Sequence, residues 1–104
     1  MLEFRQEALI LRVDGDVLEI FRRGVFSERV PLAWLAVQVL PASKGSLIVR
    51  IGSAHDDAPL YEIMQKANTA RRNAVEVIIR TDEEPLYQQF FAQVAQTCGR
   101  SVLT

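Results

Sequence analysis

The side chains that could carry out chemistry are few and lie far apart along the chain. His55 is the single histidine, and Asp56 and Asp57 follow it. One imidazole and two carboxylates are a possible set of metal ligands. Three consecutive side chains do not converge easily on one ion, however, and the sequence holds no second histidine to complete the shell. A polar loop accounts better for these residues, so we expect no metal site.

Two further groups have structural interpretations. Asp14 and Asp16 flank Gly15, but a calcium loop needs six or more oxygen ligands and a later glutamate in register. A hairpin turn explains the three residues better, because glycine adopts a positive φ without a steric penalty. Cys98 is the sole cysteine, so an internal disulfide is excluded, and its place on an apolar stripe indicates a core thiol.

The sequence gives little indication of catalysis. Its glycines stand singly and form no phosphate-binding loop, and no serine lies in a nucleophile elbow. We therefore expect a protein that is not an enzyme and that needs no cofactor.

Two arginine pairs and one tryptophan remain as candidates for an interaction surface. Arg22–Arg23 and Arg71–Arg72 lie at or near predicted turns, and guanidinium groups suit carboxylates or phosphates. The simpler interpretation is that these turns are solvated. Trp34 has two interpretations: a core residue at one end of the sheet, which we favour, or an exposed anchor of an interaction surface.

The composition describes an ordinary domain. The 104 residues carry a net charge of −1, and 49% of them are hydrophobic. This charge gives no bulk attraction to nucleic acid or to an acidic membrane. The longest apolar run, residues 32–37, is too short to span a bilayer. We expect residues 1–104 to form a single domain in the cytoplasm, with no nucleic-acid partner and no strong membrane binding.

Alternating apolar residues between turn signals predict about six or seven strands. The segment 60–73 carries overlapping signals, and strand and helix both stay open for it. The other expected strands cover residues 8–13, 17–21, 25–30, 37–40, 46–51 and 74–80.

The last segment has helical periodicity. Leu86, Phe90 and Val94 recur on one face, which predicts an amphipathic helix of about four turns. Thr81 or Asp82 is the expected N-cap, Pro85 suits the first turn, and Gly99 is the expected C-terminal stop. The fold class is therefore α+β, mainly β.

This order of elements resembles the bacterial branch of the pleckstrin-homology-like superfamily. The resemblance covers nearly the whole chain, and it is carried by residues 13–20, 29–39, 45–51, 59–61, 77–79 and 86–91. It implies a bent antiparallel barrel that one C-terminal helix caps. In phosphoinositide-binding members the first hairpin carries basic residues, whereas here Arg12 stands beside Asp14 and Asp16, which would repel a phosphorylated headgroup.

The resulting functional hypothesis is a non-catalytic module for protein interaction or self-assembly. A partly closed sheet leaves edge strands that can accept a strand from another chain, so the expected partner is another protein or a second copy. The alternatives are a peripheral membrane or lipid-binding adaptor and a small ligand-binding barrel.

Overall fold

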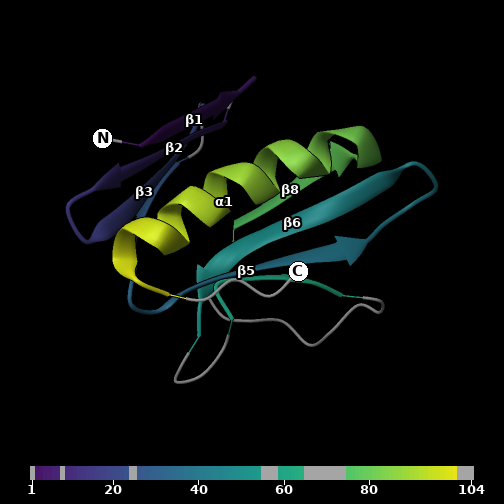
Figure 1. Cartoon of the computed structure of the whole chain (residues 1–104). Coiled ribbons are helices and arrows are strands. Elements are labelled where there is room, and N and C mark those ends of the chain that lie inside the picture. Colours follow the sequence, from purple (N-terminus) through teal and green to yellow (C-terminus); the bar gives the residue numbers. More distant parts are fainter. Residues whose placement is uncertain (1, 8, 24–25, 55–58, 65–74, 101–104) are drawn as a thin grey trace.

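The computed structural model describes residues 2–7, 9–23, 26–54, 59–64 and 75–100. In this part of the chain, eight strands precede a single 3-10 turn and one α-helix (Figure 1). The strands are β1 (Glu3–Gln6), β2 (Leu9–Asp14), β3 (Val17–Arg22), β4 (Phe26–Pro31), β5 (Leu35–Pro41), β6 (Ser46–Ser53), β7 (Tyr61–Ile63) and β8 (Val75–Arg80). The 3-10 turn is η1 (Thr81–Glu83), and the helix is α1 (Glu84–Cys98).

The first sheet is an antiparallel meander in the order β1-β2-β3-β4. The predicted hairpin at Gly15 is confirmed: Asp14 pairs with Val17, and Gly15 has a φ of 64° in the two-residue turn. Every second residue of β2 and β3 is buried, which gives the sheet one apolar face. The buried residues of these strands are Leu9, Leu11, Val13, Leu18 and Ile20.

Strand β1 was not expected from the sequence. Its exposed Glu3 and Arg5 alternate with Phe4, whose ring lies 4.6 Å from that of Tyr87 in α1. A charged outer face is usual for an edge strand, but it removes most of the apolar alternation from which a strand is predicted.

The second sheet has the order β7-β5-β6-β8. Strands β5, β6 and β8 are antiparallel, whereas β7 runs parallel to β5, contrary to the expected fully antiparallel arrangement. The ambiguity in segment 60–73 is resolved only for Tyr61–Ile63, which is a strand; residues 65–73 lie outside the described part of the chain.

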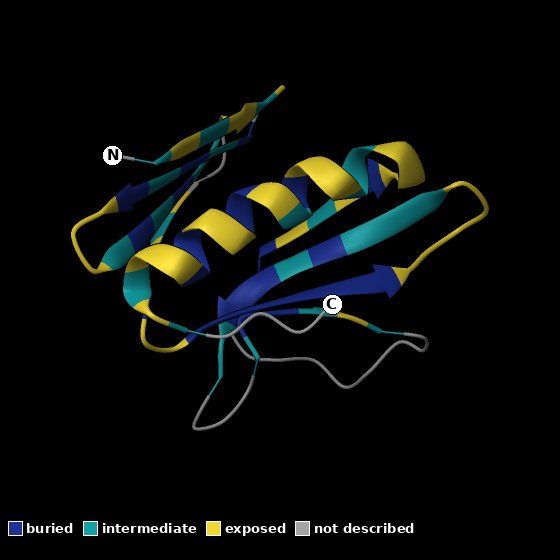
Figure 2. Ribbon diagram, in the orientation of Figure 1, coloured by how far each residue is buried: buried dark blue, intermediate teal, exposed yellow. Residues whose placement is uncertain are grey.

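Helix α1 presents its apolar face to both sheets. Phe90 lies 5.5 Å from Phe4 of the first sheet, and Phe91 lies 5.8 Å from Tyr61 of the second, measured between ring centroids. Figure 2 shows the buried side of α1 turned toward the strands and the exposed side turned to solvent. Leu86, which was expected to begin the apolar stripe, is 52% exposed, and Tyr87 occupies the first buried position instead.

The two ends of the helical segment differ in how well they were predicted. Gly99 ends α1 in the left-handed conformation, with a φ of 73°, and Pro85 lies in the first turn, as expected. Neither expected residue caps the N-terminal end: the Glu83 carboxylate accepts a hydrogen bond of 2.8 Å from the Arg80 N–H. The sulfur-bearing Cys98 packs against the core while staying partly exposed.

The described chain is thus mainly β, with two four-stranded sheets and one C-terminal helix. No helix among the described residues is both long enough and apolar enough to cross a bilayer.

Candidate functional site: the outer edge of strand β8

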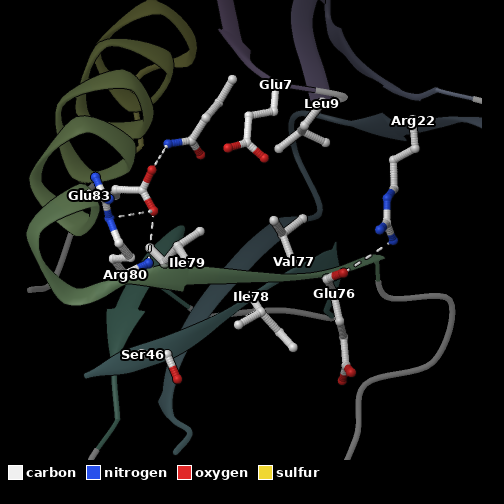
Figure 3. A pocket seen from close by; sticks show the side chains of 11 residues that line it. Glu7, Leu9, Arg22, Ser46, Glu76, Val77, Ile78, Ile79, Arg80 and Glu83 are labelled. Carbon is white, nitrogen blue, oxygen red and sulfur yellow. Dashed lines mark hydrogen bonds and ion pairs between the residues drawn. The ribbon is translucent and has the colours of Figure 1, made fainter. Parts of the chain in front are cut away.

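A cavity of about 600 Å³ lies between strand β8 and the ends of the first three strands; we call it the β8 groove (Figure 3). Residues 76–80 of β8 form one wall. Gln6, Glu7, Leu9 and Arg22 form the opposite wall. The two sheets therefore both contribute to the groove, although they are separate hydrogen-bonded ladders.

Strand β8 is the last strand of its sheet, so one of its backbone edges has no neighbouring strand in the described sheet. Successive residues of an antiparallel strand direct their N–H and C=O groups alternately toward and away from the neighbour. The Thr81 N–H donates to the Gly45 carbonyl at 3.3 Å, which places the odd-numbered residues of β8 toward β6. Glu76, Ile78 and Arg80 therefore direct their backbone groups outward, and we call these groups the outer edge of β8.

Both ends of this outer edge are already hydrogen-bonded. Arg22 Nη1 donates to the Glu76 carbonyl at 3.2 Å, and the Arg80 N–H donates to Glu83 Oε1 at 2.8 Å (Figure 3). Between them, the N–H and C=O of Ile78 make no hydrogen bond to any described residue. Unpaired backbone groups on an edge strand are a template for another strand, so Ile78 marks the position where pairing can begin.

The side chain of Ile78 extends an apolar row across the outer face of the second sheet. Ile78 pairs with Ile48, which pairs with Leu40. Leu40 is buried, whereas Ile78 is 74% exposed. Figure 3 shows Ile78 on the opposite side of β8 from Val77 and Ile79. The row therefore ends in an uncovered isoleucine at the edge of the sheet.

Charged residues flank Ile78 on the same face. On one side, Glu76 forms an ion pair with Arg50 of β6, with 2.7 Å between the guanidinium nitrogen and the carboxylate oxygen. On the other, Arg80 lies 3.3 Å from the Asp82 carboxylate, and both side chains are about three-quarters exposed. The outer edge thus presents an acidic, an apolar and a basic residue in order.

A chain of hydrogen bonds fixes one end of the β8 groove. The Tyr87 hydroxyl donates to Gln6 Oε1, and Gln6 Nε2 donates to Glu83 Oε2 at 2.5 Å. Glu83 then holds the Arg80 amide through its other oxygen. Burial raises the pKa of the Tyr87 hydroxyl well above its ordinary range, and the charges of Glu83 and Glu7 raise it further. The Tyr87 hydroxyl therefore stays protonated, and keeps its hydrogen bond to Gln6, at pH values where an exposed tyrosine begins to ionise.

The other edge strands are less suited to accept a strand. Strand β1 has four residues and carries Glu3 and Arg5, β4 ends at Pro31, and β7 has only three residues. Short length, charge and proline all protect an edge from pairing. Among the described edges, β8 combines six residues with an exposed apolar side chain at an unpaired backbone position.

Trp34 is 55% exposed, so the favoured core interpretation was wrong. The residue lies in a turn after Pro31, where its N–H donates to the Pro31 carbonyl at 3.0 Å. Leu32 and Leu35 on either side are the buried residues of this segment. The Trp34 carbonyl accepts a hydrogen bond of 2.9 Å from the Ala54 N–H, so its backbone is held beside the end of β6 while its side chain stays exposed.

Among the described residues, Arg22 and Trp34 do not line a common cavity. Arg22 lines the β8 groove, Arg23 is exposed just after β3, and Trp34 lines neither described cavity. Arg71 and Arg72 lie outside the described residues. Of the candidates that the structure describes, only Arg22 lines the groove.

The first hairpin does not present a basic cradle. The Arg12 guanidinium donates to Glu19 Oε1 through Nη2 at 2.9 Å and through Nε at 3.1 Å. Asp14 and Asp16 at the turn are exposed. The Glu19 carboxylate offsets the charge of this guanidinium and so weakens its attraction for a phosphate.

A second cavity of about 520 Å³ lies beside the C-terminal end of α1 and includes Cys98 and Arg100 in its lining. Arg100 Nη1 donates to the carbonyls of Leu32 at 2.8 Å and Leu35 at 2.6 Å, so this side chain ties the helix end to the turn between β4 and β5. The described residues include no cluster of three or more potential metal ligands. Residues 55–57, the considered metal-ligand set, lie outside the described part of the chain.

Sequence reasoning missed Ile78, Gln6 and Glu83. The sequence shows Ile78 between Glu76 and Arg80, opposite the apolar face of Val75, Val77 and Ile79. An isoleucine on the polar face of a predicted strand is a signal that can be found. Its significance depends on β8 being an edge, which is a property of the sheet.

Comparison of the chain with protein-family models, with curated proteins and with solved structures gave no match.

Proposed function

We propose that this protein is a non-catalytic interaction module that binds an extended protein segment along the outer edge of β8. The observation that carries the proposal is the unpaired Ile78 backbone beside a 74% exposed Ile78 side chain. An added strand would satisfy both backbone groups and remove apolar surface from water at the same position.

The groove supports this proposal through its shape. A strand added to β8 would have one face over Ile78 and the other toward the wall that contains Leu9 and Arg22 (Figure 3). Since side chains of a strand point alternately to its two faces, the outer face and the groove wall would select different residues of the bound segment.

The contacts of two groove carboxylates, Glu76 and Glu83, support a structural role for these two residues. Glu83 holds the Arg80 N–H with one oxygen and Gln6 with the other, and Glu76 is paired with Arg50. Both oxygens of Glu83 and Oε2 of Glu76 are thus engaged within the protein, and these contacts fix the shape of the wall. We therefore propose recognition of a segment, without chemistry on it.

We further propose that the architecture is pleckstrin-homology-like. Support comes from the element order, with two four-stranded sheets followed by one C-terminal helix that packs on both. The parallel pairing of β7 with β5 departs from the expected antiparallel pattern. An experimentally determined structure with the barrel closed at one corner would support this assignment, and an open sandwich would contradict it.

The function is tested with a fluorescently labelled peptide of residues 75–82, used as a probe strand. Ile78→Pro removes the central N–H donor of the outer edge. The variant should still fold, because an edge strand accepts proline where the N–H points away from the neighbouring strand. We expect this variant to bind the peptide about tenfold more weakly or worse than the unaltered protein, measured by fluorescence anisotropy.

Ile63→Pro is the matched control. Ile63 is also an exposed isoleucine in an edge strand, and the neighbouring Met64 N–H donates to Val39, so the Ile63 N–H faces away from β5. This control should bind the peptide like the unaltered protein, with circular dichroism showing that both variants are folded. Equal binding by all three proteins, or no binding by any of them, would refute the proposal.

A further inference from the structure

We propose that the segment bound at β8 is the β8 strand of a second copy of this chain, antiparallel to the first and related to it by a two-fold axis at Ile78. This inference rests on the proposed function and names its partner. It follows from three properties of the outer edge: the direction of its backbone groups, the order of its charges and its apolar row.

The backbone directions allow this pairing. In an antiparallel pair, a residue whose N–H and C=O point toward the partner strand lies opposite a residue whose N–H and C=O point back toward it. Glu76, Ile78 and Arg80 all face outward, as the Thr81 and Arg22 hydrogen bonds show. A two-fold axis at Ile78 places each of them opposite an outward-facing residue: Ile78 opposite the partner's Ile78, and Glu76 opposite the partner's Arg80.

The charges select this register over its neighbours. With the axis at Ile78, each Glu76 lies opposite an arginine and each Arg80 opposite a glutamate. An axis at Glu76 would oppose two carboxylates, and an axis at Arg80 would oppose two guanidinium groups. Directly opposed like charges destabilise a strand pair, whereas opposite charges stabilise it. The order acidic, apolar, basic is therefore complementary to itself.

The apolar row becomes continuous in the same register. Leu40, Ile48 and Ile78 are cross-strand neighbours in one copy. With the partner's Ile78 opposite, the row would run from Leu40 of one copy to Leu40 of the other across six strands. The two exposed Ile78 side chains would cover each other, which removes apolar surface from water.

Arg22 and Glu83 set how far the pairing extends. The two Ile78 residues can exchange both of their backbone hydrogen bonds at once, because no described residue occupies these groups. The flanking pairs require Arg22 to release the Glu76 carbonyl and Glu83 to release the Arg80 N–H. We therefore expect a dimer that is held chiefly at its centre and exchanges between partners.

The first experiment exchanges the charges in separate chains. Glu76→Arg and Arg80→Glu each oppose like charges in a homodimer, so each variant should dimerise about tenfold more weakly than the unaltered chain in analytical ultracentrifugation. An equimolar mixture of the two variants should restore dimerisation, because every opposed pair is then of opposite sign. A defect confined to folding would not be rescued by mixing.

The second experiment tests the register with cysteines, in a Cys98→Ser background. Hydrogen-bonded antiparallel pairs have Cα atoms about 5.5 Å apart, within the range that a disulfide spans. Ile78→Cys should therefore cross-link readily to itself under mild oxidation. Glu76→Cys alone should not, whereas a mixture of the Glu76→Cys and Arg80→Cys variants should. Ile63→Cys is the exposed-position control.

The outcomes separate this inference from the proposed function. A protein that stays monomeric at all concentrations, yet binds the strand peptide at Ile78, would overturn the inference and leave the proposed function standing. Absence of both dimerisation and peptide binding would overturn both. A dimer that does not respond to either charge reversal, or that cross-links equally at Ile63 and Ile78, would refute the β8 interface.

Discussion

At the scale of single residues, Trp34 shows how a large apolar side chain can contribute little to the core. It is more than half exposed, while Phe91 is completely buried in α1. We expect Trp34→Ala to lower the free energy of unfolding by less than about 1 kcal/mol. Phe91→Ala should lower it by about 3–5 kcal/mol. Urea denaturation followed by circular dichroism measures both, and similar losses would contradict the observed position of Trp34.

Gln6 is a residue whose importance lies in two hydrogen bonds. Its side chain accepts from the buried Tyr87 hydroxyl and donates to Glu83. Gln6→Leu removes both hydrogen bonds and leaves the Tyr87 hydroxyl without its acceptor. We therefore expect a loss of about 1–3 kcal/mol in the free energy of unfolding.

Tyr87→Phe provides the control for this prediction. If the hydroxyl acts through Gln6, the double variant should lose less stability than the sum of the two single losses. Additive losses would show that the two side chains act independently.

At the scale of elements, the end of α1 depends on one backbone conformation. Gly99 has a φ of 73°, and its N–H donates to the Ala95 carbonyl. Residues with a Cβ atom adopt this conformation at a cost, and asparagine does so more easily than alanine. Gly99→Ala should therefore lower the free energy of unfolding by about 1 kcal/mol, and Gly99→Asn by less. Thermal unfolding tests this order, and a reversed order would contradict the assigned helix end.

The sequence correctly predicts a turn and a helix end that are determined by residues close together along the chain. The hairpin at Gly15 and the C-terminal stop at Gly99 follow from turn chemistry close in sequence. Strand β1 escaped prediction because its charged edge face hides the alternation. The parallel pairing of β7 also escaped, because it depends on which strand the chain meets after the intervening loop.

The candidate site was predictable only in fragments. The sequence predicts Arg22 as an interaction residue because it forms an arginine pair with Arg23, and Arg22 does line the β8 groove. The sequence does not mark Ile78 as an interaction residue, because the alternation of Glu76, Ile78 and Arg80 is also compatible with a strand that has neighbours on both sides. The position of a strand within its sheet is decided by distant pairings, which a single sequence does not display.

At the scale of the whole molecule, both tyrosines make the stability of the fold depend on pH in the alkaline range. Burial raises the pKa of Tyr61 above its ordinary value of 10.0, with the hydrogen bond to Glu84 adding to the shift, and burial also raises the pKa of Tyr87. The folded protein therefore retains protons that the unfolded chain releases. Stability contributed by the neutral hydroxyls is complete below pH 10 and falls as the pH rises beyond it.

We accordingly expect the ultraviolet absorbance of tyrosinate to appear together with loss of circular dichroism, in one alkaline transition. Tyr61→Phe should move this transition to higher pH, since one of the two linked groups is then absent. Tyrosinate absorbance that rises near pH 10 while the protein stays folded would contradict the buried positions of these hydroxyls.

The strand order of the second sheet has a consequence for how the chain folds. Strands β5 and β6 are joined by the short turn at residues 42–45, while β7 and β8 join opposite sides of this central hairpin. Closing a short loop costs less chain entropy than closing a long one, so the hairpin can nucleate first and the two outer strands can add to it in either order. In hydrogen exchange, the amides shared by β5 and β6 should then be the last to open, and β8 can detach and re-form without unravelling the pairing of β7.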